Sequence, residues 1–123
     1  MNRTTKIMKG FVYAFNGLRE SFQTQVNFRI HLIAALAAII MGAYLHISTT
    51  EWLFIILSIT MVLTCEQMNT ALEYFVDLVS PEYHTLAGKI KDISAGCVLI
   101  AAIASFVIGS IIFVPKLITL AGQ

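Results

Sequence analysis

The chain has 123 residues, of which 58% are hydrophobic and 12% charged, and its mean hydropathy is +0.81. This composition excludes a water-soluble globular domain, and the length excludes several domains, so an all-α integral membrane protein with a single domain is expected. The net charge of +1 says little about partners, and no basic run interleaved with aromatic residues predicts nucleic-acid binding.

The first predicted element is a helix over residues 5–24. Its apolar side chains recur at steps of four and three, while polar side chains occupy other faces. This pattern is typical of an amphipathic helix lying in the membrane interface. A second interpretation is that the apolar face of this helix packs against the helical bundle. The apolar members are Ile7, Phe11, Phe15, Leu18 and Phe22, and the polar ones are Lys6, Lys9, Asn16, Arg19 and Glu20.

Three apolar segments follow, and each is predicted to be a membrane helix. A helix rises about 1.5 Å per residue, so roughly twenty residues cross a hydrocarbon core of about 30 Å. The first segment is not interpreted as a cleaved signal sequence, because it begins too far into the chain and is too long. The predicted ranges are 29–47, 51–79 and 92–114.

The second and third segments differ in how they end. The second is apolar only as far as Cys65, but its helical pattern continues to Val79, before Ser80 and Pro81 stop it, so it is expected to cross the membrane and emerge. The third is expected to end at Pro115. Small residues recur every four positions along it, which favours close approach of another helix. They are Ala101, Ser105 and Gly109.

Basic residues are distributed unevenly about these segments. They precede the first span and lie between the second and third, whereas the 46–51 loop has none and only Lys116 falls on the opposite side. Because basic loops stay cytoplasmic, the N-terminus and the 80–92 loop are predicted to be cytoplasmic. The basic residues on that side are Arg3, Lys6, Lys9, Arg19, Arg29, Lys89 and Lys91.

A polar stripe formed by Glu66, Asn69, Glu73 and Asp77 interrupts the second span. At about 100° per residue, these four residues share an arc of roughly 80° on one helix face. Acidic groups in a membrane helix usually mark a functional site, because each carboxylate needs a cation, a proton or water. A solvated helix end beyond the membrane surface is the alternative, which Asn69 between two glutamates disfavours.

Two carboxylates on one face can divide the tasks of holding a divalent cation and accepting a proton. Lys91 and Asp92 are expected to open the next helix at the same membrane face, where a lysine and free backbone amides favour phosphate. These groups suit phosphoryl transfer, which needs positioning and charge neutralisation. No Walker A motif or kinase catalytic loop is present, so a kinase of either common class is excluded.

The 66–77 run, EQMNTALEYFVD, followed by His84, Gly88 and the 91–96 run KDISAG, strongly resembles the small bacterial integral-membrane diacylglycerol kinase family, which includes undecaprenol kinases. The resemblance spans nearly the whole chain. It implies a homotrimer in the bacterial inner (plasma) membrane, with three membrane helices and a surface helix per subunit and active sites between subunits. The implied reaction is ATP-dependent phosphorylation of a membrane lipid alcohol, with Mg²⁺ as cofactor.

The resemblance also implies roles for individual residues. Glu66 would be the general base, Glu73 would bind magnesium, Asn69 would orient the reacting groups and Lys91 would neutralise phosphate charge. His84 matches a family position, but a structural role is the more common one for a loop histidine. The supporting residues around the nucleotide would be Lys6, Lys9, Arg19, Asp77 and Asp92.

Gln25 departs from the family pattern, which usually has a second magnesium-binding glutamate at this position. A neutral amide oxygen should bind the metal more weakly. The favoured interpretation is that Glu73 and the ATP phosphates suffice, and the alternative is a weakened or inactive family member acting as a membrane scaffold. Direct transport is disfavoured, because a small multidrug transporter normally has four spans.

The identity of the lipid stays open between undecaprenol and diacylglycerol. The start of the second span at Glu51 and Trp52, and the end of the third at Pro115 and Lys116, look more like the undecaprenol kinase branch. A site that opens sideways to the bilayer would accept many alcohols, so this likeness indicates a preference only.

Overall fold

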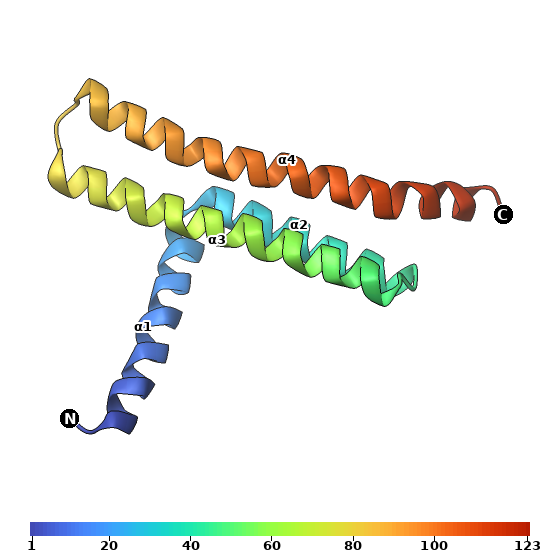
Figure 1. Cartoon of the computed structure of the whole chain (residues 1–123), viewed down its shortest axis with the longest axis horizontal. Helices are drawn as coiled ribbons and strands as arrows, with labels where there is room; N and C mark the ends of the chain where they lie inside the picture. The colour runs from blue at the N-terminus through green and yellow to red at the C-terminus, as the bar shows by residue number, and fades with distance from the viewer.

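The computed structural model describes all 123 residues as four helices with no strand. Three of them lie side by side, and α1 leaves the start of α2 at a steep angle (Figure 1). Three helices are long and apolar enough to cross a membrane, as expected from the sequence. The helices are α1 (Arg3–Thr24), α2 (Val26–Tyr44), α3 (Thr49–Val79) and α4 (Thr85–Ala121).

Only 16 of the 123 residues are buried, so most large apolar side chains lie on the outside of the chain. Ile33, Leu57 and Phe106, one from each long apolar helix, are all exposed. Exposed apolar surface in water costs about 25 cal/mol per Å², and patches of this extent need lipid or another protein to cover them. The exposed faces therefore agree with a membrane location for α2, α3 and α4.

The three apolar helices differ in length. α2 has 19 residues, α3 has 31 and α4 has 37. At 1.5 Å per residue they measure about 28, 46 and 55 Å, against a hydrocarbon core of about 30 Å. α2 therefore just crosses the core, whereas α3 and α4 extend beyond it.

The limits of α4 differ from those predicted for the third span. The expectation that Pro115 ends this helix is wrong, because α4 continues through it to Ala121. A proline removes one backbone donor, which membrane helices tolerate when neighbouring groups satisfy the freed carbonyls. Here the freed carbonyl is that of Ile111, one turn before Pro115; on the other side, the Thr119 hydroxyl donates to the Pro115 carbonyl at 3.0 Å.

The start of α4 is also earlier than predicted. His84 is the N-cap residue, and its Nδ1 accepts a hydrogen bond of 3.1 Å from the Leu86 amide. Lys91 therefore lies at the end of the second turn of α4 and Asp92 at the start of the third, and the expectation that they open the helix is wrong. The free amides of the helix start lie about two turns before them, and His84 has a structural role as a cap.

A sharp corner joins α1 to α2. Gln25 is the only residue between the two helices, and its backbone N–H donates to the Ser21 carbonyl at 2.9 Å. The Arg29 guanidinium donates to the carbonyls of Phe22 and Gln23, at 2.7 and 3.2 Å. A cation on the last carbonyls of α1 complements the negative end of the helix dipole, so Arg29 fixes this corner.

The short loop between α2 and α3 lies at the best-packed part of the chain, which we call the packed end. Ser48 and Glu51 form a reciprocal capping box at the start of α3, and Glu51 also pairs with Lys116 of α4 at 3.1 Å. A Cβ on Gly42 would lie 2.8 Å from the Trp52 ring, so only glycine fits beneath it. The core of the packed end comprises Ile47, Ile55, Ile112 and Phe113.

The stripe of small residues on α4 packs partly as expected. Ala101 is buried, and the Ser105 hydroxyl donates to the Ser58 carbonyl of α3 at 3.3 Å. The helix that approaches closely at these two positions is therefore α3 of the same chain. Nothing lies within 4 Å of a Cβ added to Gly109, so no helix of this chain approaches closely at that residue.

Candidate active site

The polar stripe lies on the second half of α3, on the face and in the order that the sequence predicted. Glu66 is 2% exposed and Asn69 8%, Glu73 is half-buried and Asp77 is exposed. Roughly twenty residues of helix cross the hydrocarbon core, so the part of α3 beyond Asn69 can reach the headgroups and water. The stripe therefore runs from a buried carboxylate to an exposed one.

Asn69 and Glu73 are in contact with each other. The Asn69 amide nitrogen donates to Glu73 Oε1 at 3.4 Å. The side-chain oxygen of Asn69, Oδ1, is buried and has no hydrogen-bond partner within the chain. Because buried polar atoms in folded proteins are nearly always paired, an unpaired oxygen beside a carboxylate suits a bound ligand.

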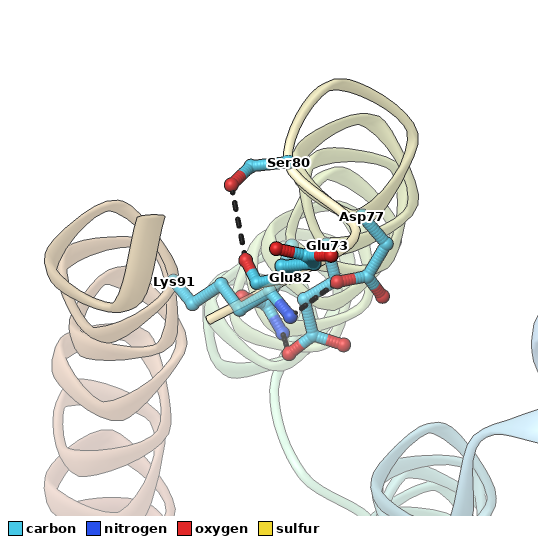
Figure 2. A network of polar contacts seen from close by, with 6 residues as sticks. Glu73, Asp77, Ser80, Glu82 and Lys91 are labelled. Atoms are coloured by element: carbon cyan, nitrogen blue, oxygen red, sulfur yellow. Dashed lines mark hydrogen bonds and ion pairs between the residues drawn. The ribbon is translucent and has the colours of Figure 1, made fainter. Parts of the chain in front are cut away.

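At the exposed end of the stripe, α3 and α4 are joined by an ion pair. Lys91 reaches from α4 to the carboxylate of Asp77 on α3, with Nζ and Oδ1 2.5 Å apart (Figure 2). Nearby, the Ser80 hydroxyl donates to the Glu82 carbonyl at 3.2 Å and orders the loop to α4. We call this region, with Glu73, the polar end. The Asp77 and Lys91 side chains are 62% and 37% exposed, so a phosphate could compete for the lysine.

Two polar groups next to Glu66 were not predicted from the sequence. The Thr70 hydroxyl donates to the Glu66 carbonyl at 3.0 Å, which satisfies the threonine within the helix. His31 of α2 brings its Nε2 to 3.7 Å from Glu66 Oε2. A histidine within an apolar membrane helix is itself an unusual feature, and this was the signal available in the sequence.

The predicted residues on α1 do not reach the stripe within one chain. Lys6, Lys9 and Arg19 form no ion pair, and neither does Asp92 on α4. Arg19 instead borders a hollow of about 690 Å³ between α1, α2 and α3, lined mainly by apolar side chains such as Phe22. Any contact of these cations with a ligand at the stripe would need a second subunit or a ligand that extends to α1.

Gln25 lies at the corner between α1 and α2, and its side-chain amide nitrogen donates to the Thr24 hydroxyl at 3.1 Å. That hydroxyl is 3.1 Å from the Tyr74 hydroxyl, which donates to Glu20 at 3.0 Å. Tyr74 follows Glu73 in α3, so this network ties α1 beside the stripe. Gln25 itself has no hydrogen bond to Glu73.

The donor set of the stripe fits magnesium only together with phosphate. No group of three or more His, Cys, Asp and Glu side chains comes together as a metal cage. Magnesium in kinases typically takes one or two carboxylates and completes its shell with phosphate oxygens and water. Glu73 and the unpaired Asn69 oxygen beside it are suitable ligands of this kind.

Comparison with known proteins identifies the family. The sequence profile of the family described as "Prokaryotic diacylglycerol kinase" matches residues 12–113 of this chain. The chain belongs to this family. An undecaprenol kinase of Bacillus subtilis is 40% identical over 116 residues, covering 94% of each chain. A diacylglycerol kinase of Escherichia coli K12 is 33% identical over 103 residues, covering 84% of each chain.

Membership in the prokaryotic diacylglycerol kinase family makes this chain part of a family of lipid kinases, which are phosphotransferases. The family assigned from the 66–77 run is thereby confirmed. A multi-pass membrane protein with three apolar helices agrees with it.

Proposed function

We propose that the protein is an ATP-dependent kinase that phosphorylates the hydroxyl of a membrane lipid alcohol, with undecaprenol the first candidate and diacylglycerol the second. The observation that carries the proposal is the α3 stripe in a chain of this family. A buried carboxylate, Glu66, lies one turn from the Asn69 and Glu73 pair, and a basic residue follows at the polar end. These groups can provide a base, a metal ligand and a phosphate ligand.

In the proposed reaction, Glu66 takes the proton from the lipid hydroxyl. The hydroxyl oxygen bonds to the terminal phosphorus of ATP as the bond from that phosphorus to ADP breaks, and the proton on Glu66 later returns to water. The position of Glu66 at the edge of the hydrocarbon core suits a base that acts on an alcohol anchored in the membrane.

Three further groups support this step. Glu73, with the Asn69 oxygen, would hold magnesium, which neutralises charge on the phosphates as they transfer. Lys91 would exchange its contact with Asp77 for a phosphate oxygen. Lys6, Lys9, Arg19 and Asp92 would complete the nucleotide site across a subunit boundary in a homotrimer.

Orientation and location follow from the charge distribution. The basic residues other than Lys116 lie in α1, at the start of α2 and in the first two turns of α4, which supports a cytoplasmic N-terminus in the bacterial inner membrane. The polar end then faces the cytoplasm, where ATP is available.

Phosphorylation of undecaprenol and of diacylglycerol, measured side by side in mixed micelles with magnesium and labelled ATP, tests the proposal. We expect turnover of at least one lipid and a loss of about 10²–10⁴ in kcat for Glu66→Gln. Glu51→Gln, at the other end of α3, is the matched control and should retain the wild-type kcat. Absence of turnover with either lipid would overturn the proposal in favour of an inactive scaffold with Gln25 in place of a metal ligand.

A further inference from the structure

The carboxylate of Glu66 has one ion-pair partner in the chain. Glu66 is 2% exposed, and the side chain that approaches its Oε2 is the His31 imidazole of α2, with Nε2 at 3.7 Å. A buried carboxylate is unfavourable unless it is paired, and His31 is the group that meets this need. The imidazole is itself 21% exposed.

The other surroundings of Glu66 offer no alternative partner. Glu73, two turns further along α3, is the other charged group close enough to act on Glu66, and it repels a negative carboxylate. The remaining ion pairs join Asp77 to Lys91 and Glu51 to Lys116, so α1 and α4 contribute no cation to Glu66. The position of the carboxylate therefore depends on α2.

His31 also lines an apolar groove. The groove, of about 530 Å³, lies between α2, α3 and α4, and hydrophobic residues form 14 of its 19 lining positions. His31 is the only ionisable residue that lines it, and Val62 and Leu63 line it one turn before Glu66. His31 therefore contacts both the carboxylate and the apolar groove.

We propose that His31 is a positioning residue for Glu66, and this proposal rests on the proposed kinase function. The imidazole Nε2 holds Oε2 of the carboxylate, so that Oε1 stays directed to the lipid hydroxyl whose proton it accepts. The contact of 3.7 Å is longer than a hydrogen bond, so a small movement of either side chain, or one bridging water, completes it. His31 takes no part in bond making.

Kinetics of three purified full-length variants test this role, with wild type as reference. His31→Leu removes the donor, His31→Gln keeps an N–H donor, and His46→Asn changes a histidine in the loop between α2 and α3, outside the site. We expect His31→Leu to lower kcat about tenfold, with KM for ATP unchanged within about twofold, because orientation of the base affects the chemical step. His31→Gln should recover a substantial part of this loss, and His46→Asn should behave as wild type.

Equal losses for His31→Leu and His31→Gln, or wild-type kcat for His31→Leu, would overturn the positioning role. Absence of turnover in the wild type would overturn the proposed function itself, so the two failures are distinguishable. Thermal unfolding in detergent shows whether His31→Leu is folded.

A spectroscopic measurement tests the contact without activity. The chain has three histidines, so ¹⁵N-histidine labelling gives three imidazoles to assign. Glu66→Gln should shift the ring ¹⁵N resonances of His31 and leave those of His46 and His84 unchanged. An unchanged His31 signal would overturn the contact and the proposal with it.

Discussion

The packed end and the polar end of the bundle carry one α3–α4 ion pair each, in different surroundings. At the packed end, Glu51 and Lys116 lie beside a reciprocal cap and a core that encloses Gly42. At the polar end, Asp77 is exposed and Lys91 is half-buried, and the buried side-chain oxygen of Asn69 has no partner. At the packed end the cap and the ion pair satisfy each other, whereas the polar end leaves groups that a ligand can satisfy, so changes at the two ends should affect different properties.

The largest effect is expected at the polar end for Glu73→Gln. Loss of a metal-binding carboxylate should lower kcat by about a hundredfold and raise the magnesium concentration needed for half-maximal activity. Magnesium titrations at saturating ATP measure this, with Glu51→Gln at the packed end as the control. Thermal stability should not fall, and an unchanged magnesium dependence would contradict a metal role for Glu73.

The two ion pairs provide a direct comparison. Lys91→Met should raise KM for ATP about tenfold, because it removes a charged contact to phosphate, and should change the thermal midpoint little. Lys116→Met, the matched change at the packed end, should leave KM for ATP at the wild-type value. Similar KM values for both variants would show that Lys91 serves only as a structural partner of Asp77.

At the packed end, Gly42→Ala should reduce stability rather than catalysis. The added Cβ would lie 2.8 Å from the Trp52 ring, so the ring or α2 must move, at a cost of about 1 kcal/mol. Thermal or chemical unfolding in detergent measures this. Gly109→Ala, with open space around its Cβ, is the control and should not destabilise the protein. A midpoint equal to wild type would show that Trp52 shifts freely.

The smallest effect is expected for Gln25→Glu, which restores the carboxylate that the family usually has. Activity at limiting magnesium should rise about two- to threefold, because a charged oxygen binds the metal more strongly than an amide. At saturating magnesium the variant and wild type should be equal. An unchanged magnesium dependence would count against a metal role for this position.

Local sequence patterns predicted the parts of the structure that depend on one helix at a time. Helical spacing alone puts Glu66, Asn69, Glu73 and Asp77 on one face, and apolar length alone predicts the three membrane helices. The continuation of α4 past Pro115 was missed because a proline ends most helices in soluble proteins, whereas membrane helices tolerate the loss of one backbone donor.

Contacts between helices were beyond the reach of such patterns. The approach of His31 to Glu66 and of Tyr74 to Glu20 depends on how α2 and α1 are rotated against α3, which no spacing rule gives. The start of α4 at His84 depends on a side-chain cap whose geometry only the structure reveals. The predicted roles of Lys6, Lys9 and Arg19 remain predictions, since no contact within one chain tests them.

The corner fixed by Arg29 gives the thickness of the bilayer a direct influence on this protein. α2 has 19 residues and is about 28 Å long, so no turn of it extends beyond the hydrocarbon core. At its start, the Arg29 guanidinium holds the end of α1. Longer helices adapt to a thick membrane by changing their tilt, but a helix that only just spans the core must draw the lipids toward it. Acyl-chain length in the host membrane should therefore affect the depth at which α1 meets the headgroups.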